Sequence, residues 1–236
     1  MNGNFRIFLA VAGLMVTSLA CQAVMGDGGL QNPPETQTPQ ETQPPQEPQP
    51  AVLLSDDFSS SYWGTGTGAD SSVEYSNEAL QIIVFTKNYF VWSTPDAESY
   101  QNIHMEVDVI NNDADSTTAF GFLCHLQGDA NSFYYLLMTP AGEYAIAKAT
   151  EDQNDIFLTN DDRWGTSDLI PQNSPSYRVG VDCGNNTLTL YVNDQKIDSV
   201  TDSTYTSGGV GLVVWSGEEA TQTNVSFDDF LMTELP

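Results

Sequence analysis

Positive charge is scarce in this sequence. Lys and Arg together number 6, against 32 Asp and Glu, so the formal net charge is −26. A surface this acidic repels phosphate backbones, and it lacks the basic patch that docks proteins on anionic lipid. The composition therefore argues against nucleic acid as a partner. It suits cation binding or a protein outside the cytoplasm, and solubility is its simplest interpretation.

Cysteine is also rare, with only Cys21, Cys124 and Cys183 in the chain. Cys21 lies in an N-terminal export segment described below, which leaves a pair. An even pair in an exported domain favours a disulfide between Cys124 and Cys183. This bond would close a loop of about 60 residues and contribute roughly 4 kcal/mol in the chain-entropy model. Two buried free thiols are the alternative.

Familiar catalytic motifs are absent. The sequence contains no Gly-x-Ser-x-Gly elbow, no His-Glu-x-x-His helix and no phosphate-binding glycine loop before a helix. The glycine-rich segment 64–68 is interpreted as a flexible loop. We therefore lean towards a protein without catalytic activity. If it is an enzyme, the candidate catalytic residues are His104, Glu106 and Asp108, which alternation places on one strand face.

No apolar run is long enough to span a bilayer comfortably, since the run from Ile7 ends at Val16. It follows Arg6 and leads into Ala20 and Cys21. This pattern resembles a bacterial lipoprotein signal peptide with a loose lipobox, in which Cys21 is lipidated after cleavage. Residues 1–21 are thus expected to be a signal peptide, with cleavage without lipid as the alternative. The resemblance implies an extracytoplasmic protein, lipid-anchored to the bacterial membrane or cell surface.

Residues 22–51 are expected to form a disordered linker rich in Pro, Gln, Thr and Glu. The stretch from Gln31 to Pro50 has no aromatic and almost no aliphatic side chain. It cannot bury enough apolar surface to offset the entropy of ordering. Its prolines favour extended polyproline II, so the segment is interpreted as a semi-rigid tether.

From Val52 onwards, short apolar runs alternate with polar residues. The clearest example is 177–200, where Gly184–Asn186 and Asn193–Asp194 provide two tight turns between three strands. Further strands are expected near 52–58, 72–75, 79–85, 89–92, 103–110, 118–126, 132–138, 144–149, 156–159, 209–215 and 224–232. No long stretch has a helical period. Residues 52–236 are therefore predicted to form one all-β jelly-roll sandwich.

Several segments in this region carry a resemblance to a known family. They are Asp56–Phe58, Phe120–Cys124, Phe133–Tyr135, Gly142–Lys148, Asp182–Asp194, Ser207–Leu212 and Phe227–Phe230. In this order they resemble the concanavalin A-like lectin/glucanase superfamily, which includes laminin G-like domains. Within it, the chain is similar to domains labelled 3-keto-disaccharide hydrolase-like in bacterial lipoproteins. The resemblance implies a jelly roll, but such folds host enzymes, lectins and spacers alike.

The resemblance also implies two features that can be compared with the residues present: a metal site and the carboxylates of a glycosidase. Paired first and last strands would bring Asp57 and Asp228 together, where jelly rolls of this kind often hold a structural Ca²⁺. Turn capping or solvent exposure is the alternative for both. Family 16 glycoside hydrolases carry Glu-x-Asp-x-x-Glu, whereas the strand from Glu106 ends this pattern in Asn111, which cannot donate a proton as an acid.

Aromatic residues give the remaining functional prediction. The chain has 4 Trp and 10 Tyr, and its tryptophans fall at expected strand ends or in loops. Flat rings with a polar edge stack on sugar faces, so we expect Trp63, Trp92, Trp215 and Tyr62 to contact a ligand. Core packing is the alternative, above all for Trp92 and Trp215. The predicted function is carbohydrate or glycoconjugate binding, with a sugar hydrolase or an adhesion module as alternatives.

Overall fold

The computed structural model describes residues 50–235 apart from 96, 114–115 and 219–221. The expected signal peptide, the lipidation residue Cys21 and nearly all of the expected linker lie outside these residues. Every regular element in the described part of the chain is a β-strand. No helix in it is long and apolar enough to be a candidate membrane span.

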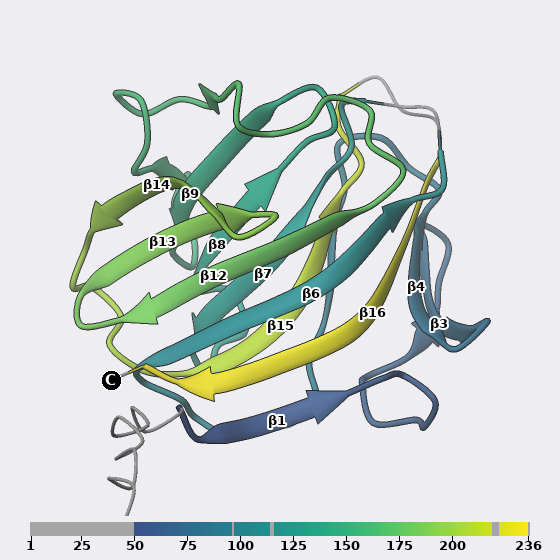
Figure 1. Ribbon diagram of the computed structural model, residues 1–236, viewed down its shortest axis with the longest axis horizontal. Coiled ribbons are helices and arrows are strands. Elements are labelled where there is room, and N and C mark those ends of the chain that lie inside the picture. Colours follow the sequence, from purple (N-terminus) through teal and green to yellow (C-terminus); the bar gives the residue numbers. More distant parts are fainter. Residues whose placement is uncertain (1–49, 96, 114–115, 219–221, 236) are drawn as a thin grey trace, which may run out of the picture. The chain divides into compact units, whose positions relative to one another are not determined.

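The strands form two antiparallel sheets (Figure 1). The first contains β1 (Val52–Asp56), β2 (Gly66–Thr67), β3 (Ser71–Ser76), β4 (Ala79–Val84), β6 (Ile103–Asn111), β12 (Tyr177–Gly184), β13 (Thr187–Val192), β14 (Gln195–Thr201) and β16 (Thr223–Glu234). Its order is β14-β13-β12-β6-β16-β4-β3-β2, with β1 paired to β16. We call it the front sheet, because β13, β12, β6 and β16 face the viewer in Figure 1.

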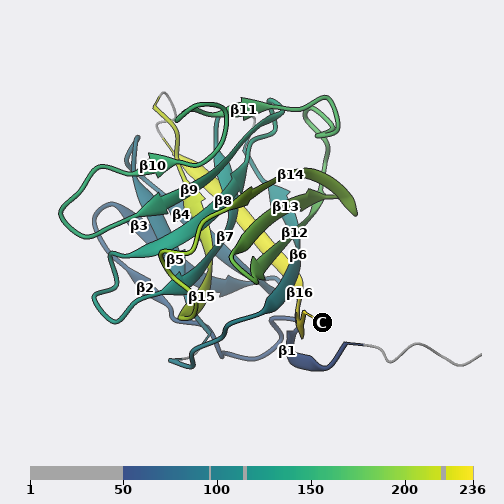
Figure 2. The ribbon, with the colours of Figure 1, turned by 90° about the vertical axis from the view of Figure 1, so that its left-hand side faces the viewer.

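The second sheet, here called the back sheet, contains β5 (Phe90–Ser93), β7 (Ala119–Leu126), β8 (Phe133–Met138), β9 (Glu143–Ala149), β10 (Ile156–Phe157), β11 (Gly165–Thr166) and β15 (Gly209–Trp215). Its order is β10-β9-β8-β7-β15-β5. The short strands β10 and β11 both pair with β9, at opposite ends of it (Figure 2). The chain segment that connects them therefore lies along one edge of the back sheet.

Alternation of side chains decides what lies between the sheets. In β6, Met105, Val107 and Val109 are fully buried, whereas His104, Glu106 and Asp108 point to the other face. Apolar residues from both sheets join them in one core, so burial of their surface holds the two layers together at about 25 cal/mol per Å². The predicted all-β sandwich and its strand faces are confirmed.

A disulfide joins the sheets through this core. Cys124 of β7 and Cys183 of β12 are bonded, with their Cα atoms 6.6 Å apart. Both residues are fully buried. The predicted Cys124–Cys183 pairing is confirmed, and it links the back sheet to the front sheet directly.

The two predicted tight turns, after β12 and after β13, have the backbone conformation expected from their residues. Asn185, Asn186, Asn193 and Asp194 all have positive φ, as two-residue hairpin turns require.

The flexible-loop interpretation of segment 64–68 needs a correction, because Gly66–Thr67 pairs with β3 as strand β2. Two residues are too short to show a strand period, so the sequence carries no signal for this pairing.

Candidate functional site

The outer face of the back sheet carries a second apolar cluster, separate from the core. Its buried members are Ala119, Leu123, Phe133, Tyr135, Leu137, Ala147, Ala149 and Val213, and its partly buried members are Phe90, Trp92, Leu126, Phe157, Trp164 and Trp215. An outer sheet face of a soluble protein is normally polar. This face therefore needs an explanation other than folding alone.

All the aromatic rings of this cluster line a hollow of about 810 Å³, which we call the aromatic groove. Phe133 and Tyr135 are 5% exposed and form its floor. Phe90 stacks on Phe133 with centroids 6.0 Å apart, and Trp92 lies 5.8 Å from Phe133. Trp164 stacks on Trp215 at 5.8 Å. The partly exposed rings are thus held in fixed positions by other rings.

Two glycines allow neighbouring strands of the back sheet to approach closely. Gly121 of β7 and Gly211 of β15 share the outer face with Leu123 and Val213. A Cβ at Gly121 would lie 2.2 Å from the backbone oxygen of Leu136, and a Cβ at Gly211 would lie 2.7 Å from that of Ser93. Any larger residue would therefore push the strands apart beneath the groove.

Polar loops surround the aromatic floor. The rim is formed by Asn88, Asn131 and the loop between β9 and β10, which contributes Thr150–Gln153 and Asp155. The Tyr135 hydroxyl donates to Oδ2 of Asp155 at 2.9 Å. Burial, together with the charge of Asp155, raises the pKa of Tyr135 well above its usual range. The phenol therefore keeps its proton and links the floor to the rim.

A second hollow of about 340 Å³ adjoins the Trp164–Trp215 pair. Both indoles line this hollow as well as the aromatic groove. Thr117, Thr139, Glu143 and Glu218 complete its lining. The stacked indoles thus border both hollows.

The structure divides the predicted ligand-contact residues. Trp92 and Trp215 line the aromatic groove, whereas Tyr62 is exposed but is not among the groove residues. Trp63 is only 3% exposed, and its ring packs on Phe58 and Phe230 in the core. The expectation that Trp63 stacks on a ligand is therefore corrected. Its indole nitrogen donates to Asp56, which satisfies its one polar group inside the protein.

Sequence reasoning missed five aromatic groove residues, namely Phe90, Phe133, Tyr135, Phe157 and Trp164. Phe90 was detectable, because it precedes the predicted residue Trp92 by two positions, and Phe133 and Tyr135 are spaced by two in the same way. Residues spaced by two on a strand share a face. The positions of Phe157 and Trp164 depend on how the β10 and β11 segment folds onto β9, which no local pattern reveals.

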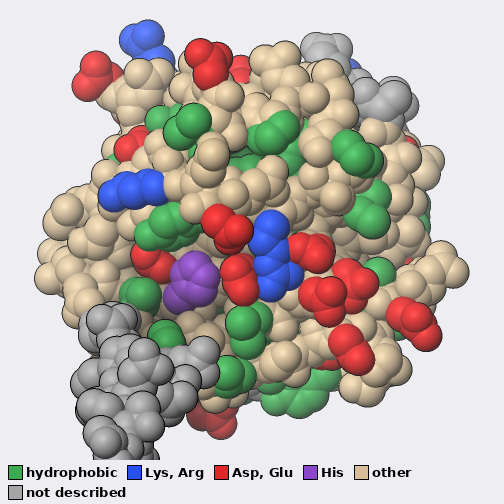
Figure 3. Space-filling view, in the orientation of Figure 1, with side chains coloured by type: hydrophobic (Ala, Val, Ile, Leu, Met, Phe, Trp, Pro, Cys, Tyr) green, Lys and Arg blue, Asp and Glu red, His purple; other side chains and the backbone are tan. Residues whose placement is uncertain are grey.

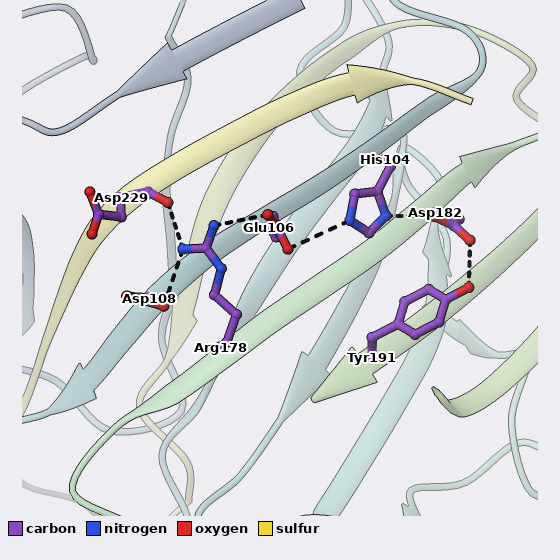
Figure 4. A network of polar contacts seen from close by, with 7 residues as sticks. All are labelled: His104, Glu106, Asp108, Arg178, Asp182, Tyr191 and Asp229. Carbon is purple, nitrogen blue, oxygen red and sulfur yellow. Dashed lines mark hydrogen bonds and ion pairs between the residues drawn. The ribbon is translucent and has the colours of Figure 1, made fainter. Parts of the chain in front are cut away.

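The outer face of the front sheet has a different character. Figure 3 shows carboxylates gathered around one cation and one histidine on this face. Arg178 of β12 lies opposite Asp108 of β6 in the strand register, and Asp182 lies opposite His104. Figure 4 shows the resulting chain of contacts, which runs from Asp229 through Arg178 to Tyr191.

The candidate catalytic residues are all part of this network. Arg178 contacts Glu106 at 3.1 Å and Asp108 at 3.1 Å, so one guanidinium bridges both carboxylates. His104 Nδ1 lies 2.7 Å from Asp182, which also accepts from the Tyr191 hydroxyl at 2.7 Å. The three residues do lie on one face, as predicted. Their charged groups take part in pairing across β6 and β12.

Titration behaviour follows from these contacts. The hydrogen bond with Asp182 raises the pKa of His104 above its usual value, against the opposing effect of burial. Burial and the contact with Asp182 raise the pKa of Tyr191 to about 12. Burial opposes the charge on Arg178, but hydrogen bonds with Glu106 and Asp108 raise its pKa.

The other histidine, His125, is 3% exposed and is among the residues that line a small hollow of about 260 Å³. It has a positive φ near the end of β7. Its ring nitrogens lie 3.0 Å from the Tyr205 carbonyl oxygen and 2.9 Å from that of Gln101. The imidazole thus contacts the backbone of two separate loops.

The predicted calcium residues Asp57 and Asp228 are close to each other, and calcium binding there stays a prediction. β1 pairs with β16 as expected, and the charge of Asp57 contributes to the raised pKa of Asp228, for which burial is the largest cause. Asp57 accepts a hydrogen bond from the backbone of Ser59, as a turn cap does. Arg178 lies in the same hollow as Asp57 and Asp229, where its charge opposes a cation. No group of three or more potential metal ligands occurs among the described residues.

Comparison with known proteins identifies the fold. No protein-family model matches the sequence, and no curated protein matches it. Among solved structures, the carbohydrate-binding module CBM66 from Bacillus subtilis superposes with a TM-score of 0.56 at 18% identity. The match covers 73% of this chain and 96% of that one.

Two further solved structures superpose on this domain over most of their length. A protein of unknown function with a galectin-like fold from Bacillus subtilis has a TM-score of 0.58 at 12% identity, over 78% of this chain and 96% of that one. The κ-carrageenase of Pseudoalteromonas carrageenovora, in complex with an oligotetrasaccharide of κ-carrageenan, has a TM-score of 0.53 at 12% identity, over 84% and 99%. The domain is a concanavalin A-like jelly-roll sandwich, as predicted.

Proposed function

We propose that this domain binds carbohydrate in the aromatic groove and does not cleave it. The observation that carries the proposal is the set of partly exposed rings, among them Trp92, Trp164 and Trp215, around one hollow with a polar rim. Flat rings stack on the apolar faces of sugars, and rim amides and carboxylates accept or donate hydrogen bonds to hydroxyls. A volume of about 810 Å³ suits a short oligosaccharide.

Similar structures support this choice of ligand. One is named as a carbohydrate-binding module, and another holds an oligotetrasaccharide. The absence of cleavage is proposed because Glu106 and Asp108, the candidate carboxylates, are both paired to Arg178 on the opposite sheet. A glycosidase instead needs two carboxyl groups flanking a bound sugar, one of them able to donate a proton.

We also propose that the protein is a lipoprotein displayed outside the cytoplasm of a bacterium. The support is the sequence alone, with Ala20 and Cys21 at the end of a short apolar run. Labelling of the expressed protein with a fatty acid tests this. Wild-type protein should carry the label and the Cys21→Ser variant should not, whereas an unlabelled wild-type protein would contradict it.

A polysaccharide panel tests the main proposal. The purified protein is incubated with plant, microbial and host glycans, and both its depletion onto insoluble glycan and the release of reducing sugar are measured. Depletion that is lost in Trp92→Ala, without sugar release, is the expected result. Sugar release that disappears in Glu106→Gln would favour the hydrolase. If no glycan depletes the protein, an adhesion or protein-interaction role replaces this proposal.

A further inference from the structure

Both hollows beside the indole pair carry acidic side chains. Glu151, Asp152 and Asp155 lie on the rim of the aromatic groove, and Glu143 and Glu218 line the second hollow. Among the described residues, neither hollow is lined by a lysine, arginine or histidine. A glycan bearing carboxylate or sulfate groups would therefore meet repulsion at both places, within a chain whose net charge is already −26.

Rings and carboxylates together favour a positively charged ligand. An ammonium group over the face of a tryptophan gains cation–π energy of about 0.5–2 kcal/mol. A carboxylate within hydrogen-bond distance adds a charge-assisted bond. The groove offers both, since the indoles of Trp92, Trp164 and Trp215 share one hollow with the carboxylate rim. A neutral sugar would use the rings but not the charge.

The indole pair indicates how such a ligand lies. Trp164 and Trp215 border both hollows, and the Trp215 indole nitrogen donates to Asn88 at 3.1 Å. A sugar stacked on these rings would have one neighbour in the aromatic groove and another in the second hollow. The site therefore suits the interior of a chain of several sugars better than a single chain end.

We propose that the groove binds a polymer of amino sugars with free, protonated amines, laid across the Trp164–Trp215 pair. The amines face the carboxylates of both hollows while the rings stack on the sugar faces. This inference rests on the proposed carbohydrate binding and specifies its ligand class. Glycans with neutral N-acetylated amines bind more weakly, and uronic acid polymers bind least.

Three matched oligosaccharides test the proposal: a glucosamine hexamer, its fully N-acetylated counterpart and a galacturonate hexamer. Affinities are measured by calorimetry below the pKa of the sugar amine, at low and at high salt. The glucosamine hexamer should bind at least about tenfold more tightly than the acetylated one, and this advantage should shrink with salt. A glucosamine dimer, too short to reach both hollows, should bind at least about tenfold more weakly than the hexamer.

Variants separate the site from the overall charge of the protein. The double variant Glu151→Gln/Asp152→Asn and the variant Glu218→Gln should each reduce the preference for free amines. Glu78→Gln removes one charge, as Glu218→Gln does, but from the exposed β3–β4 turn of the front sheet, and it should leave the preference unchanged. An equal loss in Glu78→Gln would overturn the proposal, since attraction would then be non-specific.

The two proposals fail in different ways. Equal or tighter binding of the acetylated hexamer would overturn the amino-sugar inference and leave carbohydrate binding intact. Binding of none of the three, together with no depletion by the wider glycan panel, would overturn both.

Discussion

The indole rings of Trp164 and Trp215 stack with centroids 5.8 Å apart and an interplanar angle of 28°. Trp164 lies in the segment before β11, and Trp215 is the last residue of β15. Asn88, in the loop before β5, accepts a hydrogen bond from the Trp215 indole nitrogen. Three segments distant in the sequence thus fix this pair of rings, which we call the indole platform.

Removing one ring of this platform should weaken glycan binding. Trp164→Ala is expected to lower affinity at least about tenfold, because the stacked sugar loses its surface and Trp215 loses its support. Trp164→Phe, which keeps a flat ring, should retain more of the affinity. The affinities are measured by titrating each folded protein with a glycan that the wild type binds. Unchanged affinity in Trp164→Ala would place the ligand elsewhere.

Trp63 should matter for stability and not for binding. Its buried ring packs on Phe58 and Phe230, so Trp63→Ala leaves a cavity that should cost about 3–5 kcal/mol in the free energy of unfolding. Urea denaturation measures this cost. The partly exposed Trp92 is the matched control, and Trp92→Ala should cost clearly less. A stability loss in Trp92→Ala as large as that in Trp63→Ala would contradict the assignment.

Loss of the disulfide should lower the stability of the domain. Cys124 and Cys183 are separated by 59 positions, and their bond is expected to contribute roughly 4 kcal/mol through restriction of the unfolded chain. The Cys124→Ala/Cys183→Ala variant should therefore have a lower denaturation midpoint. Thiol titration of unfolded, unreduced protein should detect neither cysteine. Two reactive thiols there would show that the bond is not formed.

The His104–Asp182 contact should make stability depend on pH. The pKa of His104 is raised in the folded protein, so the contact stabilises fully at a pH below the ordinary value of 6.5. This contribution is lost as pH rises through the raised folded value. The melting temperature of wild type relative to His104→Gln should therefore fall as pH increases through this window. An NMR titration should place the pKa of His104 above 6.5; a value below it would contradict this prediction.

Much of the fold was predictable because it depends on local patterns. Residues such as Met105, Val107 and Val109 alternate with charged ones, and this period alone separates the core face from the solvent face. Asparagines at 185, 186 and 193 mark the hairpin turns for a similarly local reason. The disulfide followed from counting cysteines in a domain that the sequence predicts to be exported.

The site was less predictable because it depends on contacts between distant segments. Trp63 and Trp164 both lie outside the strands, but one folds into the core and the other into the groove. Nothing in their immediate neighbours separates these outcomes. Arg178 presents a similar case, since its pairing with Glu106 and Asp108 arises from the register of β12 on β6. That register joins the candidate catalytic residues in one network of ion pairs and hydrogen bonds.

The pairing of β1 with β16 also makes the domain a convenient unit of construction. Val52 lies opposite Thr233, so the strands that open and close the domain have their outer ends about 5 Å apart. Both belong to the front sheet, while the aromatic groove lies on the back sheet. The domain could therefore be spliced into a surface loop of an unrelated scaffold, as well as fused to either end. The sheet face that carries the aromatic groove would stay open in each arrangement, so a proposed binding activity could be moved with the domain.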